Sequence, residues 1–147
     1  MAPDIDPASP SYDLDELNAR GNSRFPGHVG FEVVAAEKGM LAARLDLQPH
    51  HLAPNGYLHA AVVITLADTA AGYGCVGSLP DGATGFTTIE LKSNFLGTLH
   101  EGALACTATM VHGGRSTQVW DAPVHDEATN RTIALFRCTQ MILWPRA

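Results

Sequence analysis

One carboxylate stands alone in a long apolar segment of this chain. Residues 55–77 read NGYLHAAVVITLADTAAGYGCVG, and between His51 and Asp81 the only formal charge is Asp68. An apolar helix of this length must be buried on all sides. A buried carboxylate without a partner is costly or shifts its pKa. Asp68 is therefore either a structural carboxylate held by nearby donors or a reactive base.

The start of the same segment offers a second chemical feature. His59 marks the expected start of a helix over residues 58–77, and the N–H groups of Ala60 and Ala61 lie in its first turn. Such N–H groups, aligned with the helix dipole, stabilise negative charge. They could hold the oxyanion that forms during acyl transfer.

The spacing keeps these two features apart within one chain. Asp68 follows His59 by nine residues, which at about 100° and ~1.5 Å per residue gives opposite helix faces and an axial separation of roughly 13 Å. One substrate carbonyl cannot touch both. If both serve one reaction, Asp68 of one chain must meet Ala60 of a second chain, so a dimer would hold two composite sites.

The elements that position these residues are predicted from periodicity and turn signals. Residues 13–21 have the pattern of a short helix with Asp13 as its cap, and residues 25–28 that of a turn. We expect strands at residues 29–36, 40–47, 85–96, 102–112, 117–125 and 132–143. Their spacing indicates an antiparallel meander with hairpin-length connections. Pro123 cannot donate to a ladder, so its strand must be bulged or lie at an edge.

One packing buries such a helix in so small a protein. It is an α+β fold in which an antiparallel sheet of five to six strands wraps around one long central helix. The sheet covers only part of the helix, so burial predicts a second copy against the rest. We expect residues 1–24 to form an N-terminal arm with a short helix, and residues 25–147 to form a single domain.

Composition excludes several classes of function. A net charge of −6 with nine Lys and Arg in 147 residues offers no footprint for nucleic acid. Three dispersed cysteines argue against disulfides or a zinc site and suit the cytoplasm, and the N-terminus has no signal-peptide pattern. Residues 58–79 are long enough to span a bilayer, but Asp68 lies at their midpoint, so no membrane partner is expected. Adjacent His50 and His51 lack a carboxylate partner, so we expect no metal and no cofactor.

Four segments together resemble the hotdog-fold acyl-CoA thioesterases of the phenylacetate-degradation (PaaI) type, which are similar to the hydroxybenzoyl-CoA thioesterases. The segments are His59-Ala-Ala, Leu66-Ala-Asp-Thr-Ala70, TTIELKSNFL at residues 87–96, and His112-Gly-Gly-Arg115. The resemblance covers roughly residues 25–143. It implies hydrolysis of an acyl-CoA to a free acid and CoA by a homodimer or a dimer of dimers.

The resemblance also implies roles for individual residues. Asp68 matches the helix carboxylate that acts as general base or nucleophile. Ala60 matches the residue whose N–H, supplied by the partner subunit, polarises the thioester carbonyl. His59 matches the motif histidine that shapes the helix start and contacts the thioester region, and Thr88 matches a strand hydroxyl that faces the attacking water.

The last segment is implied to bind CoA. Arg115 and Ser116 match a turn near the nucleotide or pantetheine of CoA, and an Arg pairs naturally with phosphate. Gly114 belongs to the same turn, and His112, which opens it, would line the CoA channel.

The chain departs from the family pattern in two places. This chain has Ala60-Ala61 where the family has Gly-Gly. The two methyl groups narrow the active site, but the backbone N–H of residue 60 is kept. The family often has Asn or Gln six residues before the motif histidine, where this chain has Ala53. Asn55 either replaces that side chain by a different loop path or is a plain Pro-Asn-Gly turn residue.

Two other functions remain open at this point. The fold could carry an acyl-thioester hydratase or dehydratase, although those pair a His with an acidic residue in one site. It could also be a non-enzymatic module that binds acyl-CoA.

Overall fold

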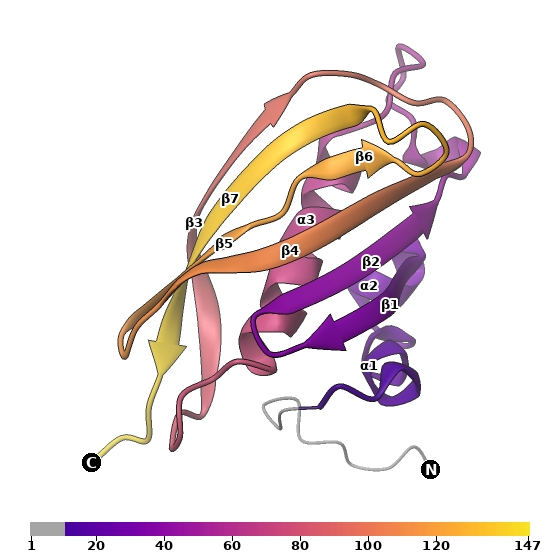
Figure 1. Ribbon diagram of the computed structural model, residues 1–147. Coiled ribbons are helices and arrows are strands. Elements are labelled where there is room, and N and C mark those ends of the chain that lie inside the picture. Colours follow the sequence, from indigo (N-terminus) through magenta and orange to yellow (C-terminus); the bar gives the residue numbers. More distant parts are fainter. Residues whose placement is uncertain (1–10) are drawn as a thin grey trace.

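The computed structural model describes residues 11–147 and shows one curved antiparallel sheet around one long helix (Figure 1). The helices are α1 (Leu14–Gly21), α2 (Phe25–Val29), the 3-10 turn η1 (Pro49–His51) and α3 (Ala60–Val76). The strands are β1 (Phe31–Glu37), β2 (Met40–Asp46), β3 (Gly85–Phe95), β4 (Ala103–Gly113), β5 (Thr117–Asp121), β6 (Val124–Asp126) and β7 (Thr132–Leu143).

The predicted architecture is confirmed, and two details of the sheet differ from prediction. The sheet has seven strands, because the segment predicted as residues 117–125 breaks at Pro123 into β5 and the short β6. The prediction of a meander is wrong for β3. The strand order is β1-β2-β4-β5-β7-β3, so β3 crosses to the far edge and pairs with β7 instead of β4. The connection from β3 to β4 is seven residues long, which allows this crossing.

The turn predicted at residues 25–28 is also wrong, because those residues form the short helix α2. Pro26 suits the first turn of a helix, where an N–H is not needed. Gly30 ends the helix in the left-handed region, with φ of 94°. The predicted cap of α1 is confirmed, since Asp13 accepts the N–H of Glu16 at 2.9 Å.

Small residues on α3 let large side chains of the sheet pack against the helix backbone. A Cβ atom at Gly74 would lie 2.7 Å from the ring of Trp120, and one at Gly72 would lie 3.0 Å from the ring of Phe86. Trp120 is fully buried. The helix and the inner sheet face therefore form one close-packed core.

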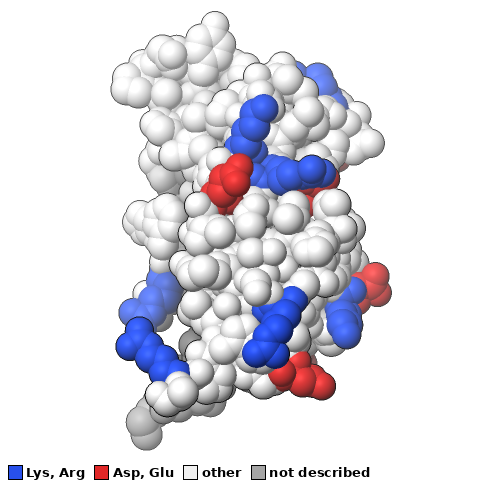
Figure 2. Space-filling view, turned by 90° about the vertical axis from the view of Figure 1, so that its left-hand side faces the viewer, with Lys and Arg blue, Asp and Glu red and all other residues white. Residues whose placement is uncertain are grey.

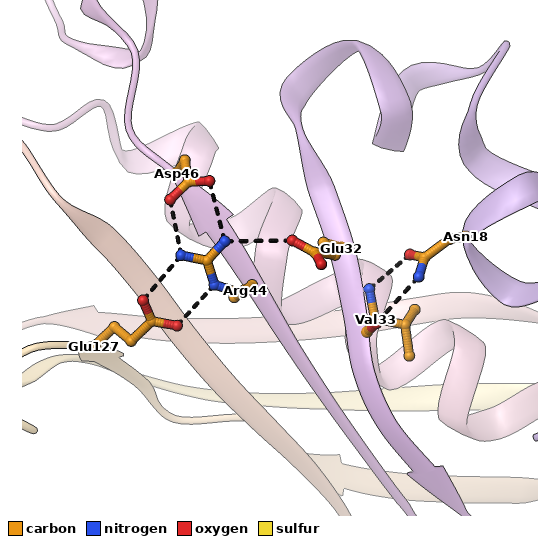
Figure 3. A network of polar contacts seen from close by, with 6 residues as sticks. All are labelled: Asn18, Glu32, Val33, Arg44, Asp46 and Glu127. Atoms are coloured by element: carbon orange, nitrogen blue, oxygen red, sulfur yellow. Dashed lines mark hydrogen bonds and ion pairs between the residues drawn. The ribbon is translucent and has the colours of Figure 1, made fainter. Parts of the chain in front are cut away.

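Polar contacts fasten the N-terminal helix and the outer face of the sheet (Figure 3). The Asn18 side chain on α1 makes two hydrogen bonds with the backbone of Val33 on β1. On the outer face Arg44 reaches three carboxylates, those of Glu32, Asp46 and Glu127. Figure 1 shows α1 and α2 beside β1, away from β3. The division of the chain near residue 24 stays a prediction, and residues 1–10 of the predicted arm lie outside the described residues.

Among residues 11–147, no helix is both long enough and apolar enough to cross a membrane.

Candidate active site

Asp68 lies half-buried near the middle of α3. Burial raises the pKa of its carboxyl above the ordinary value of 3.8, and donation from the nearby Thr88 hydroxyl would act in the opposite direction. No Lys, Arg or His among residues 11–147 forms an ion pair with this carboxylate. Such an environment is the usual way to prepare a carboxylate as a base at neutral pH.

Thr88 comes from β3 and faces the helix. Its hydroxyl oxygen lies 3.3 Å from Oδ1 of Asp68 and 2.8 Å from Oε1 of Gln140 on β7. The structure therefore brings together two residues singled out from the sequence, and it adds a third. Gln140 was missed, although it is a polar residue at an inward position in the alternating segment 132–143, which is a detectable signal.

The start of α3 presents one free backbone donor. His59 caps the helix, and its Nδ1 accepts the N–H of Ala61 at 3.0 Å. The N–H of Ala60 has no hydrogen-bond acceptor within residues 11–147. Only Ala60 thus keeps a donor for a ligand, although the sequence suggested two free N–H groups in this turn.

Asn55 sits in the loop before the helix and is exposed. Its Oδ1 accepts the N–H of Tyr57 at 3.2 Å, an arrangement common in turns. This local bond accounts for the side chain without a ligand. A catalytic role for Asn55 stays a prediction.

The turn between β4 and β5 holds the residues expected to bind CoA. The ring of His112 folds over Gly114, where a Cβ atom would lie 3.0 Å from its Nε2. The guanidinium of Arg115 stacks on Trp144 at 4.6 Å, and the carbonyl of Ser116 accepts the N–H of Ile142. The turn is therefore fixed to the C-terminal end of β7 and presents Arg115 on the surface.

A cavity of about 170 Å³ opens beside the start of α3. It is lined by Phe25, His28, Val29, His50, His51, Ala61, Val62 and Thr65. A larger hollow of about 310 Å³ includes Lys92, Asp121 and Arg137 among its lining residues. Strand register puts Lys92 opposite Arg137 and Arg137 opposite Asp121, on the side of the sheet facing away from α3. The smaller cavity is therefore the one next to the free N–H of Ala60.

Within residues 11–147, neither the cysteines nor the metal-ligating side chains form a second site. Burial raises the pKa of Cys75, Cys106 and Cys138 to about 12, so these thiols stay protonated. No group of three or more metal-ligating side chains occurs in the part of the chain that the structure describes.

Comparison with known proteins identifies the family. The model of the thioesterase superfamily matches residues 55–133, which include Asp68, Thr88, His59 and Arg115. The chain belongs to the thioesterase superfamily. The resemblance to hotdog-fold thioesterases is thereby confirmed, and the protein is a thioester hydrolase.

Similar proteins agree with this family. The 1,4-dihydroxy-2-naphthoyl-CoA hydrolase of Listeria monocytogenes is 35% identical over 111 residues, which are 76% of this chain and 89% of that protein. A mutant of thioesterase PA1618 from Pseudomonas aeruginosa has a similar fold, with a TM-score of 0.83, 24% identity, and coverage of 89% of this chain and 94% of that one. The PaaI protein of Escherichia coli also has this fold, with a TM-score of 0.72, 22% identity, and coverage of 87% and 91%.

The raised pKa of Asp68 predicts a pH-dependent effect on stability. A carboxyl whose pKa is higher in the folded than in the unfolded chain costs stability once it ionises. Asp68→Asn should therefore raise Tm at pH 7, and the gain should disappear as the pH falls below the ordinary Asp value of 3.8. Thermal denaturation from pH 3 to pH 8 measures this. A variant less stable than the wild type at pH 7 would show that the ionised carboxylate is a structural anchor.

Proposed function

We propose that this thioesterase hydrolyses an acyl-CoA, with Asp68 as the general base or the nucleophile. The observation that carries the proposal is the half-buried Asp68 carboxylate, without an ion pair in residues 11–147 and 3.3 Å from the Thr88 hydroxyl. Burial keeps this carboxylate poorly solvated and hence reactive. The similarity to a naphthoyl-CoA hydrolase supports a CoA thioester as the substrate class.

The oxyanion donor in the proposal is the N–H of Ala60 in a second copy of the chain. The roughly 13 Å of helix between His59 and Asp68 prevents one carbonyl from meeting both within one chain. The unused N–H of Ala60 lies at the positive end of the α3 dipole, where developing negative charge is stabilised. Each site would then take its base from one subunit and its oxyanion donor from the other.

The edge strand β3 is the surface proposed to join the two copies. Leu91 and Phe95 pair with Cys138 and Ala134, whose side chains are buried against α3, so they face the helix side of the sheet. They are nevertheless 40% and 46% exposed. Figure 2 shows the side of the molecule on which β3 runs, where charged side chains lie in separate groups with uncharged surface between them. An open strand edge with apolar side chains is suited to pairing with a second copy.

The cavity beside the helix start is proposed to hold the acyl group. Its walls are largely apolar, and Ala61 connects it to the oxyanion donor. A cavity of about 150 Å³ is known to accept one benzene ring, so about 170 Å³ suits a single ring or a short chain.

A screen for released thiol tests the proposed function. Acyl-CoAs of graded length and aromaticity would be supplied at equal concentration, and free CoA would be measured. We expect turnover to be highest for short or single-ring acyl groups. Tight binding of acyl-CoAs without thiol release across the panel would overturn the proposal in favour of a binding module, and hydration of crotonyl-CoA would favour a hydratase.

Arg115 is expected to bind the phosphates of CoA. Arg115→Ala should raise KM for an acyl-CoA about tenfold, because a charge-assisted hydrogen bond is lost, while kcat stays nearly unchanged. The KM for the matching N-acetylcysteamine thioester, which lacks the nucleotide, should not change. Lys38→Ala in the exposed turn between β1 and β2 is the control. An equal rise in KM for both substrates would contradict nucleotide binding by Arg115.

A further inference from the structure

Three polar side chains form a row on the inner face of the sheet. Thr88 on β3 pairs with Gln140 on β7, and Gln140 pairs with Gln118 on β5. The two glutamines are 0% and 1% exposed. A buried amide costs free energy unless its hydrogen bonds are made, so each needs an explanation in its partners.

Gln118 is explained by structural bonds alone. Its Nε2 donates to the carbonyl of Ser78 at 2.8 Å, and its Oε1 accepts the indole N–H of Trp120 at 2.9 Å. These bonds orient the largest core side chain and fasten β5 to the segment that follows α3. Both polar groups of the amide are thus used within the core.

Gln140 is bonded in a way that involves Asp68. Its Oε1 accepts the Thr88 hydroxyl at 2.8 Å, and its Nε2 donates to Sγ of Cys138 at 3.3 Å. The same Thr88 oxygen lies 3.3 Å from Oδ1 of Asp68. A hydroxyl carries one proton, so Thr88 cannot donate to both acceptors at once. The contact with the Gln140 amide is the shorter of the two. The Thr88 proton therefore points to Gln140 and not to Asp68.

We propose that Gln140 tunes Asp68 through Thr88, by accepting the one proton that would otherwise form a hydrogen bond to the carboxylate. A carboxylate deprived of that donor is a stronger base. Gln140 is thus a positioning residue that acts through a neighbour. The effect of Gln140 on the rate of turnover rests on the proposed function. The competition between Gln140 and Asp68 for the Thr88 proton does not depend on it.

The surroundings of Asp68 leave few other groups to produce this effect. Donation to an ionised carboxylate favours the charged form, so withholding it works in the same direction as burial on the pKa of Asp68. From β7, the Cys138 thiol is the titratable group that faces Asp68, and its pKa near 12 keeps it neutral. No cation forms an ion pair with Asp68 anywhere in residues 11–147.

A titration of the Asp68 carboxyl tests the proposal without any substrate. The ¹³C carboxyl resonance, assigned by its loss in Asp68→Asn, would be followed against pH in each variant. Gln140→Met removes the amide at similar length and frees Thr88 to donate to Asp68. The titration midpoint should fall by roughly one to two pH units, the effect of one hydrogen bond to a charged group. Thr88→Val removes the hydroxyl, and the midpoint should stay close to the wild-type value, because in the wild type the Thr88 proton is already held by Gln140.

The double variant shows whether Gln140 acts through Thr88. Adding Gln140→Met to Thr88→Val should leave the midpoint where Thr88→Val puts it. Gln118→Met is the matched control, because it should lower Tm and leave the Asp68 midpoint unchanged. Gln140→Asn, which draws the amide back by one methylene, gives the same downward shift and serves if the Met variant does not fold.

Two results would overturn the proposal. An unchanged or raised midpoint in Gln140→Met or Gln140→Asn would mean that the amide does not hold the Thr88 proton. An equal shift with and without Thr88 would mean that Gln140 acts by another route. In the active enzyme, the acid limb of the pH–rate profile should move with the midpoint. Lack of thioester hydrolysis would overturn the proposed function and leave the titration result intact.

Discussion

Asp68→Asn should lower kcat for acyl-CoA hydrolysis by about 10³-fold, the size expected when a general base or nucleophile is removed. Asparagine keeps the size of the side chain and can still bond to Thr88, so α3 and its packing should be unchanged. In the wild type, kcat/KM should rise with pH through a midpoint above 3.8, because only the ionised Asp68 is reactive. Steady-state thiol release and circular dichroism measure the two parts of this prediction.

A matched substitution separates this effect from a general loss of charge. Asp81→Asn changes an exposed aspartate in the turn after α3 and should leave kcat unchanged. Near-normal turnover by Asp68→Asn would exclude a catalytic carboxylate.

A single turnover of the wild type in ¹⁸O water distinguishes general-base catalysis from nucleophilic catalysis by Asp68. The label enters Asp68 only if the carboxylate attacks the thioester.

A charge on the helix side of β3 should both separate the subunits and remove activity. Leu91→Glu would bury a carboxylate in the proposed interface, where an unpaired charge is costly. The protein should become a folded monomer by light scattering. Because each site is proposed to need two chains, kcat/KM should fall by about 10²-fold or more.

The matched control is on the same strand. Asn94 pairs with Leu135, which is 50% exposed, so it faces away from the helix. Asn94→Glu should keep the dimer and its activity. A wild-type protein that is monomeric and active would contradict the composite site, as would a fully active Leu91→Glu monomer.

Local patterns in the sequence predicted most elements of the fold. Helix α3 was expected at residues 58–77 and spans Ala60–Val76, and the cap of α1 is Asp13 as expected. These features depend on neighbours in the chain. The position of β3 in the sheet does not depend on neighbours in the chain, because the sequence of a strand does not indicate which edge of a sheet it will join. The prediction of a hairpin between β3 and β4 therefore failed.

The candidate site likewise has one residue that the sequence predicted and contacts that it could not predict. Asp68 is conspicuous in the sequence because it is one charge in an apolar segment. Its link to Gln140 depends on the register of β3 with β7, which joins residues 52 positions apart. The hydrogen bond from the Ala61 N–H to His59 depends on the rotamer of the His59 side chain. No residue pattern in the sequence specifies that rotamer.

Mixing two inactive variants tests the composite site most directly. Ala60→Pro removes the N–H at the first helical position, where proline is tolerated, and His59 already has the extended backbone that precedes proline. Asp68→Asn removes the base. A hybrid dimer of the two then holds one intact site, with Asp68 from one chain and the Ala60 N–H from the other.

Each variant alone should be inactive. After unfolding and refolding an equal mixture, half of the dimers are hybrids with one of two sites intact, so about a quarter of wild-type activity should return. If the mixture stays as inactive as its components while light scattering shows normal dimers, Asp68 and Ala60 do not serve one site across the interface.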